Sequence, residues 1–99
     1  MKVNINPVHF KADQKLEEFI IDKVGKLNQY FEGVISGDVT LKLDSNDQVK
    51  DKIAEVRLII KGNDLFAKKS SKSFEDAIDQ SVEALRKQVN KHKDKLKGL

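Results

Sequence analysis

The chain has 99 residues, of which 35% are charged and 38% hydrophobic, and its formal net charge at pH 7 is +3. This length predicts one domain, residues 1–99, whose single small core buries about two-thirds of the surface of the unfolded chain. The absence of cysteine excludes a disulfide framework and any thiolate metal site.

The first predicted elements are a short strand and a helix. In Lys2–Asn6, Val3 and Ile5 alternate with polar residues, which is typical of a strand with one buried face. A helix should follow, capped at its start by Asp13 and ended by Gly33. Its apolar residues recur at helical spacing: Leu16, Phe19, Ile20, Val24, Leu27, Tyr30 and Phe31.

Three further strands are predicted in the middle of the chain. Apolar and polar residues alternate over Val39–Asp44, and the polar stretch Ser45–Lys52 is expected to form the turn that follows. The next strand has an inward face made by Ala54, Val56, Leu58 and Ile60. Gly62 and Asn63 indicate a tight hairpin, which leads into a last strand over residues 64–71.

The last predicted helix begins at Ser73, with Asp76 three residues later as in a capping box. Its apolar seam comprises Phe74, Ala77, Ile78, Val82, Leu85, Val89 and Leu96. Two helices with apolar faces can bury them against one sheet only by covering the same side of it. We therefore predict an α+β fold, a two-layer βαβββα sandwich. Its four-stranded sheet carries two helices on one face, and the first strand joins at an edge or beside a later strand.

The basic residues concentrate at the end of this helix, from Arg86 to Lys97. The stretch holds six cationic side chains against one acid, Asp94, so its formal charge is +5 and the rest of the chain sums to −2. Two cationic rows flank the apolar seam: Lys87, Lys91 and Lys95 on one side, and Arg86, Lys93 and Lys97 on the other. Like charges four residues apart repel each other, and a bound polyanion would relieve this repulsion. A solvated face whose lysines complement the helix dipole is the alternative.

No residue pattern indicates an enzyme, a cofactor or a metal site. The two histidines, His9 and His92, are far apart in the sequence, and we expect His92 to be a packing residue or an RNA donor. The spacing of Asp44, Asp47 and Asp51 fits no calcium loop, so a solvated turn is expected there. We predict no catalytic residue, no metal and no cofactor. No apolar run spans a bilayer and no signal-peptide pattern begins the chain, so we expect a cytoplasmic protein without membrane contact.

Two smaller groups of lysines lie outside the last helix. Lys23 and Lys26 come late in the first helix, whereas Lys68, Lys69 and Lys72 precede the last one. Lysines on a strand also protect a sheet edge from pairing, so the role of the second group stays open. Four aromatic residues fit the core: Phe19, Tyr30, Phe31 and Phe74. A basic surface without aromatic residues is expected to contact the phosphates of folded RNA.

Four segments of the chain resemble the ribosome hibernation-promoting factors, also called ribosomal subunit interface or ribosome-associated inhibitor proteins. They are KLNQYF at residues 26–31, GNDLFA at 62–67, AID at 77–79 and QVNKHKDKLK at 88–97. The last segment is the most specific because it joins a fixed basic spacing to an apolar seam. The resemblance covers the whole chain, and the family has the same βαβββα order, similar to double-stranded-RNA-binding domains.

The resemblance implies a protein that binds the small ribosomal subunit and its rRNA in the channel for messenger and transfer RNA. By competing with both RNAs it would block translation and stabilise idle ribosomes in stationary phase or starvation. The implied rRNA-binding residues are Lys87, Lys91, His92, Lys93, Lys95 and Lys97, followed by Arg86, Lys23 and Lys26. We expect the free protein to be monomeric.

Some features depart from the family pattern. Lys69 and Lys72 stand where the family has a small residue and an acid, and Pro7 replaces a common glycine. The chain stops at Leu99, without the dimerisation domain of long forms or the acidic tail of the inhibitor type, which implies the short form. Whether it pairs ribosomes or inactivates single ones stays open. The alternative is a protein-interaction module whose basic helix binds an acidic partner or its own copy, and an enzyme is a remote third.

Overall fold

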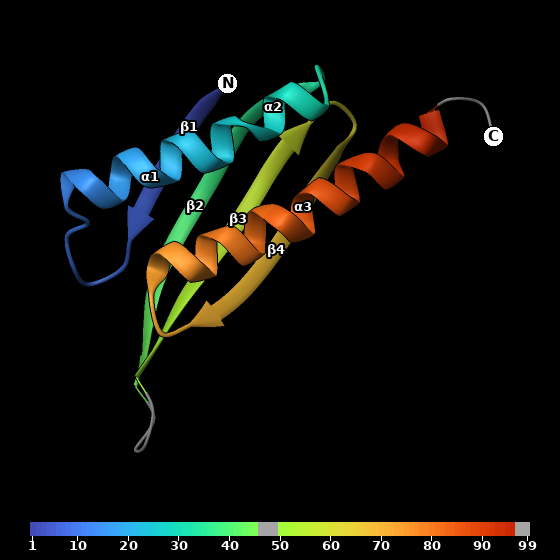
Figure 1. The fold of residues 1–99 in the computed structure, drawn as a ribbon. Helices are drawn as coiled ribbons and strands as arrows, with labels where there is room; N and C mark the ends of the chain where they lie inside the picture. Colours follow the sequence, from blue (N-terminus) through green and yellow to red (C-terminus); the bar gives the residue numbers. More distant parts are fainter. Residues whose placement is uncertain (46–49, 97–99) are drawn as a thin grey trace.

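The computed structural model describes residues 1–45 and 50–96, and side chains within 1–44 and 51–92 (Figure 1). The strands are β1 (Lys2–Pro7), β2 (Val34–Ser45), β3 (Lys50–Ile60) and β4 (Asn63–Ser71). The helices are α1 (Gln14–Gly25), α2 (Leu27–Tyr30) and α3 (Phe74–Leu96). In the described part of the chain, no helix is both long and apolar enough to cross a membrane.

The four strands form one sheet in the order β1-β2-β3-β4. β1 lies parallel to β2 at one edge, while the β2–β3 and β3–β4 pairs are antiparallel. The helices lie on the same face of this sheet (Figure 1). The predicted two-layer α+β sandwich is thus confirmed, with the first strand at an edge.

The core lies between the sheet and the helices. The inward face predicted for β3 is confirmed, and the fully buried residues from the other elements include Ile20, Val24, Leu27, Leu41, Ile78, Leu85 and Val89. Ser81 is also fully buried, and its Oγ donates a hydrogen bond to the carbonyl of Ala77 at 2.8 Å. Val82, which was predicted on the seam, is only half-buried. An internal hydrogen bond allows the small serine to occupy the buried position instead.

β2 and β3 are longer than predicted. β2 runs from Val34 to Ser45, and residues 50–52 belong to β3, where Asp51 pairs with Asp44. The predicted turn is therefore wrong at these positions, and its residues 46–49, which include Asp47, lie outside the described residues. β2 passes close beneath α1, because a Cβ at Gly37 would lie 3.1 Å from Cγ1 of Val24. Glycine permits this close approach.

The first helix is shorter than predicted. It ends at Gly25 rather than Gly33, and a separate single turn, α2, follows before Phe31 becomes extended. Glycine inside a helix costs about 1 kcal/mol relative to alanine, so the helix is weakest at this point. Leu27 of α2 is fully buried as predicted, but Tyr30 at the end of this turn is 41% exposed instead of buried in the core.

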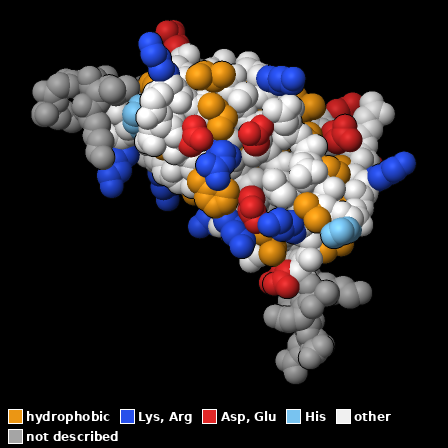
Figure 2. Space-filling view, turned by 180° about the vertical axis from the view of Figure 1, so that it is seen from behind, with side chains coloured by type: hydrophobic (Ala, Val, Ile, Leu, Met, Phe, Trp, Pro, Cys, Tyr) orange, Lys and Arg blue, Asp and Glu red, His pale blue; other side chains and the backbone are white. Residues whose placement is uncertain are grey.

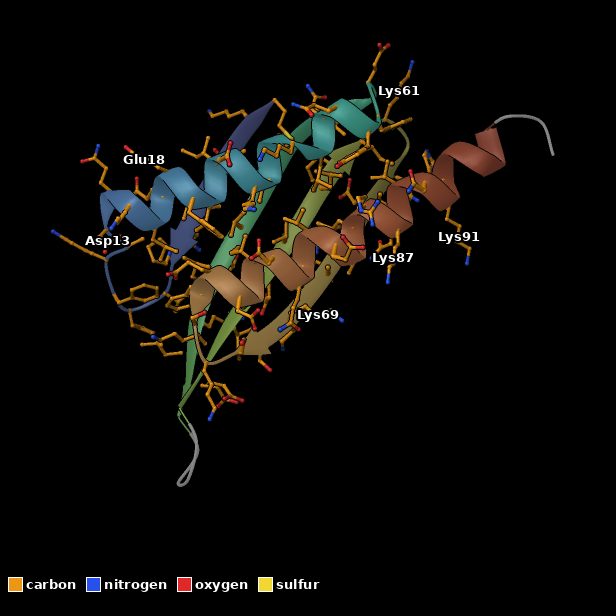
Figure 3. The ribbon with its side chains drawn as sticks, in the orientation of Figure 1. Asp13, Glu18, Lys61, Lys69, Lys87 and Lys91 are labelled. Carbon is orange, nitrogen blue, oxygen red and sulfur yellow. The ribbon has the colours of Figure 1, made fainter. Side chains whose placement is uncertain are left out.

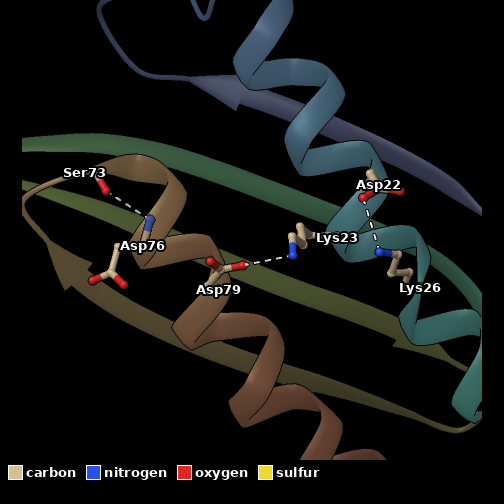
Figure 4. Close-up of polar contacts among 6 residues, drawn as sticks. All are labelled: Asp22, Lys23, Lys26, Ser73, Asp76 and Asp79. Carbon is tan, nitrogen blue, oxygen red and sulfur yellow. Dashed lines mark hydrogen bonds and ion pairs between the residues drawn. The ribbon is translucent and has the colours of Figure 1, made fainter.

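Both predicted N-caps are confirmed. The Asp13 carboxylate accepts a hydrogen bond from the backbone N–H of Leu16 at 2.8 Å, and Ser73 Oγ accepts one from that of Asp76 at 3.1 Å (Figure 4). The Asp76 carboxylate does not complete a capping box, because it accepts hydrogen bonds from Ser71 and Gln80. Both hydrogen bonds lower the pKa of Asp76, and the one from Ser71 has the larger effect.

Candidate nucleic-acid interface

The predicted cations of α3 lie on two different flanks of the helix. Lys87 and Lys91 are exposed on the flank beside β4, where Lys69 projects on the same side (Figure 3). We call Lys69, Lys87 and Lys91 the outer lysine row. Arg86 lies on the other flank, facing α1 and α2. The structure therefore brings Lys69 near two site lysines, which favours a surface role for it rather than protection of the sheet edge alone.

A groove lies between α3 and the α1–α2 segment, with a volume of about 370 Å³. Three predicted site cations line it: Lys23 from α1, Lys26 from the junction between the helices, and Arg86 from α3. Tyr30 and Val82 also line it, together with the carboxylates of Asp79 and Glu83. We call this feature the helical groove. It joins residues that are more than fifty positions apart in the sequence.

Each cation of the helical groove has a carboxylate partner. The ion pairs are Lys23 with Asp79 at 3.7 Å, Lys26 with Asp22 at 3.4 Å, and Arg86 with Glu83 at 2.6 Å (Figure 4 shows the first two). The six side chains are between 37% and 63% exposed, and exposed pairs contribute only about 0–1 kcal/mol to stability. A phosphate can therefore replace the carboxylate at small cost.

The pair between Arg86 and Glu83 is the shortest of the three. Arg86 donates two hydrogen bonds, from Nη2 at 2.6 Å and from Nε at 3.1 Å, to the two carboxylate oxygens. The hydrogen bond from Arg86 lowers the pKa of Glu83, and the same bond raises the pKa of Arg86. Both groups are thus held in their charged forms at neutral pH. In contrast, within the described side chains, Lys87 forms no ion pair.

His92 is half-buried and packs edge-on against Phe31, with the ring centroids 5.4 Å apart. This contact agrees with the packing interpretation, whereas its role as an RNA donor stays a prediction. No group of three or more potential metal ligands occurs among the described residues. Lys93 and Lys95 lie within α3, but their side chains are outside the described residues, as is the whole of Lys97.

Two exposed aromatic residues were missed in the sequence. Phe74 is buried and Phe19 and Phe31 are half-buried, as expected, but the prediction that Tyr30 belongs to the core is wrong. Phe66 is 42% exposed on the face of the sheet that no helix covers. Gly25 within the expected helix was an available signal that the helix does not run unbroken to Tyr30.

The uncovered face of the sheet has a mixed character. Lysines and arginines alternate there with acidic and hydrophobic side chains (Figure 2). Arg57 stacks over the ring of Phe66 at 5.3 Å and pairs with Asp64 at 3.7 Å. Lys42 pairs with Glu55 at 3.0 Å across two strands. This face thus balances its charges within itself.

Known proteins are similar to this chain in sequence and in fold. Residues 3–97 match the family model described as Sigma 54 modulation protein / S30EA ribosomal protein. The chain is 32% identical over 97 residues to the ribosome hibernation promoting factor of Salmonella typhimurium, and the match covers 98% of each chain.

Two solved structures have a similar fold. The N-terminal domain of protein Y from Thermus thermophilus has a TM-score of 0.82 at 20% identity, over 93% of this chain and 99% of that one. A ribosomal subunit interface protein from Coxiella burnetii has a TM-score of 0.81 at 16% identity, over 95% of this chain and 99% of that one. At these identities the likeness bears on the fold alone.

Proposed function

The chain belongs to the family described as Sigma 54 modulation protein / S30EA ribosomal protein, and from this premise we propose that it acts as a ribosome hibernation factor. It binds the small ribosomal subunit through rRNA, in the channel that messenger and transfer RNA otherwise occupy. It acts by steric occlusion rather than by catalysis, and it stabilises idle ribosomes in the cytoplasm during stationary phase or starvation.

One structural observation supports this proposal above the others. Site cations that are distant in sequence converge on the helical side of the molecule, in the helical groove and in the outer lysine row. Phosphates of folded RNA offer the complementary charge, and such contacts position a protein on RNA without reading its sequence. In the proposal, His92 and three further predicted cations also contact rRNA: Lys93, Lys95 and Lys97.

The ion pairs of the helical groove determine the order in which the cations contact RNA. The outer lysine row makes the first contact, since Lys87 has no intramolecular partner among the described side chains. Lys23, Lys26 and Arg86 then exchange their carboxylates for phosphates. If about five phosphates are engaged, the logarithm of the affinity should fall with that of the salt concentration at a slope of about −4.

Co-sedimentation with purified ribosomes through a sucrose gradient tests this function. We expect the protein to migrate with the small subunit at low salt, to dissociate at high salt and to be displaced by transfer RNA. Protein that remains at the top of the low-salt gradient would contradict the proposal. Salt-sensitive capture of an acidic protein that is indifferent to ribonuclease would instead support the interaction-module alternative.

A further inference from the structure

Two features of the helical groove are not explained by contacts to phosphates. The first is the exposed ring of Tyr30, which lies beside three cations in a groove otherwise suited to charge. The second is the pair of carboxylates, Asp79 and Glu83, which repel a polyanion. A surface that only neutralises phosphates needs neither feature.

The position of Tyr30 is well fixed from both sides. It ends the single turn α2, in which Leu27 is fully buried, and it precedes Phe31, whose ring packs against His92 of α3. Val82 adds a half-buried apolar side chain to the same groove. The groove therefore presents an anchored aromatic ring, an apolar surface and hydrogen-bond acceptors close together.

We propose that the helical groove receives one unpaired nucleobase, which stacks on Tyr30 while Lys23, Lys26 and Arg86 hold the neighbouring phosphates. This inference rests on the proposed function and adds a base-binding subsite to it. Proteins recognise folded RNA largely through unpaired bases that stack on aromatic side chains and form hydrogen bonds along their edges. Stacking on the ring accounts for the exposure of Tyr30.

The carboxylates of Asp79 and Glu83 serve as hydrogen-bond acceptors in the same subsite. When a phosphate replaces Glu83 as the partner of Arg86, the Glu83 carboxylate becomes free to accept hydrogen bonds from the edge of the base. Asp79 becomes free in the same way when Lys23 moves to a phosphate. Carboxylates accept hydrogen bonds from amino groups such as cytosine N4. The subsite should therefore prefer a base with an exocyclic amino group over uracil.

The composition of the chain supplies a specific probe, because Tyr30 is the only tyrosine and there is no tryptophan. We would titrate the protein with hexacytidylate, hexauridylate and an abasic hexamer of the same charge, all carrying a fluorescent label for anisotropy. Hexacytidylate should quench the tyrosine emission. It should bind roughly five- to 150-fold more tightly than the abasic hexamer, which is the range for stacking of one base. Hexauridylate should fall between them.

Variants separate stacking from charge. Tyr30→Ala should lose the advantage of hexacytidylate over the abasic hexamer without a change in the salt slope, since no phosphate contact is removed. Tyr30→Phe should retain most of the advantage. Phe66→Ala removes the exposed aromatic ring of the uncovered sheet face and is the matched control, and it should bind all three hexamers as the wild type does. Circular dichroism would verify the fold of each variant.

The outcomes separate this inference from the proposed function. Equal binding of hexacytidylate and the abasic hexamer without quenching would overturn the base subsite, even if the protein co-sediments with ribosomes. A Tyr30→Ala variant that loses ribosome binding while no oligonucleotide quenches the wild type would assign Tyr30 to a protein contact and would also overturn the subsite. Failure of the wild type to co-sediment would overturn the hibernation function, while the hexamers alone would then decide the subsite.

Discussion

The helical side of the molecule and the uncovered face of the sheet contain similar parts in different arrangements. Each has an exposed aromatic ring on the same face as an arginine, Tyr30 with Arg86 and Phe66 with Arg57. Each also has exposed ion pairs between side chains. An exposed aromatic residue beside a cation is thus not enough to mark a binding surface.

The difference lies in how the charges are placed. On the sheet face, Arg57 covers the ring of Phe66 and shares its charge with Asp64, so both groups are already engaged. On the helical side, cations from separate elements line one groove, and the outer lysine row adds positive charge on the opposite flank of α3. Convergence and excess of charge, rather than the kinds of residue, distinguish the two surfaces.

Charge reversal on α3 and at lysines outside it should give the largest difference in ribosome binding. We expect the triple variant Lys87→Glu, Lys91→Glu and Lys95→Glu to weaken ribosome binding by about two orders of magnitude or more, because it replaces attraction to phosphates by repulsion. The matched control reverses three exposed lysines outside α3: Lys2, Lys61 and Lys68. It should bind within a few fold of the wild type in the same sedimentation assay. Equal losses in both variants would erase the distinction between the surfaces.

A second variant weakens the start of α3 without changing the charge of the helix. Ser73→Ala removes the hydrogen bond that caps the first turn of α3, and loss of such a cap costs about 1 kcal/mol of stability. Urea unfolding should show this loss, whereas ribosome affinity at 25 °C should stay unchanged because the folded population still dominates. A parallel fall in affinity would mean that the surface depends on the rigidity of α3 and not on its charge alone.

Local chemistry made much of the fold predictable from the sequence. The alternation of β3, the hairpin glycine at Gly62 and the N-caps at Asp13 and Ser73 depend on neighbouring residues only, and all are confirmed. The path of β2 beneath α1 depends instead on contacts between elements that are distant in sequence. The close approach of Gly37 to Val24 is such a contact, and no local sequence pattern predicts it.

The candidate site also has features that local spacing predicts and features that depend on how the helices pack. The pairs of Lys26 with Asp22 and of Arg86 with Glu83 follow from spacings of four and three residues on a helix. The pair of Lys23 with Asp79 joins two helices and depends on how they pack. Tyr30, at the end of α2, is exposed although its spacing from the preceding apolar residues predicted a buried position. Sequence reasoning therefore found the cations but not the groove that collects them.

Removing one carboxylate from each surface should give a smaller but sharper contrast. Asp22→Asn leaves Lys26 without its partner, and because an exposed pair is worth about 0–1 kcal/mol, we expect ribosome affinity to rise by up to about five-fold at low salt. Asp64→Asn frees Arg57 on the sheet face and should leave the affinity unaltered. Titration of labelled protein against small subunits at two salt concentrations would measure both. A gain in the Asp64 variant alone would place the RNA on the sheet.

The smallest expected effect concerns Asp76, a carboxylate of α3 that serves the fold rather than the surface. Hydrogen bonds from Ser71 and then Gln80 lower its pKa below the ordinary value. A carboxyl whose pKa is lowered by folding stabilises the protein above its unfolded pKa, about 3.9, and this stabilisation is lost as the pH falls through the folded value. The wild type should therefore lose stability more steeply than Asp76→Asn as the pH falls below about 4. Urea unfolding at a series of pH values would measure this difference. Parallel curves of unfolding free energy against pH for the two proteins would mean that these hydrogen bonds add nothing to the stability of the folded state.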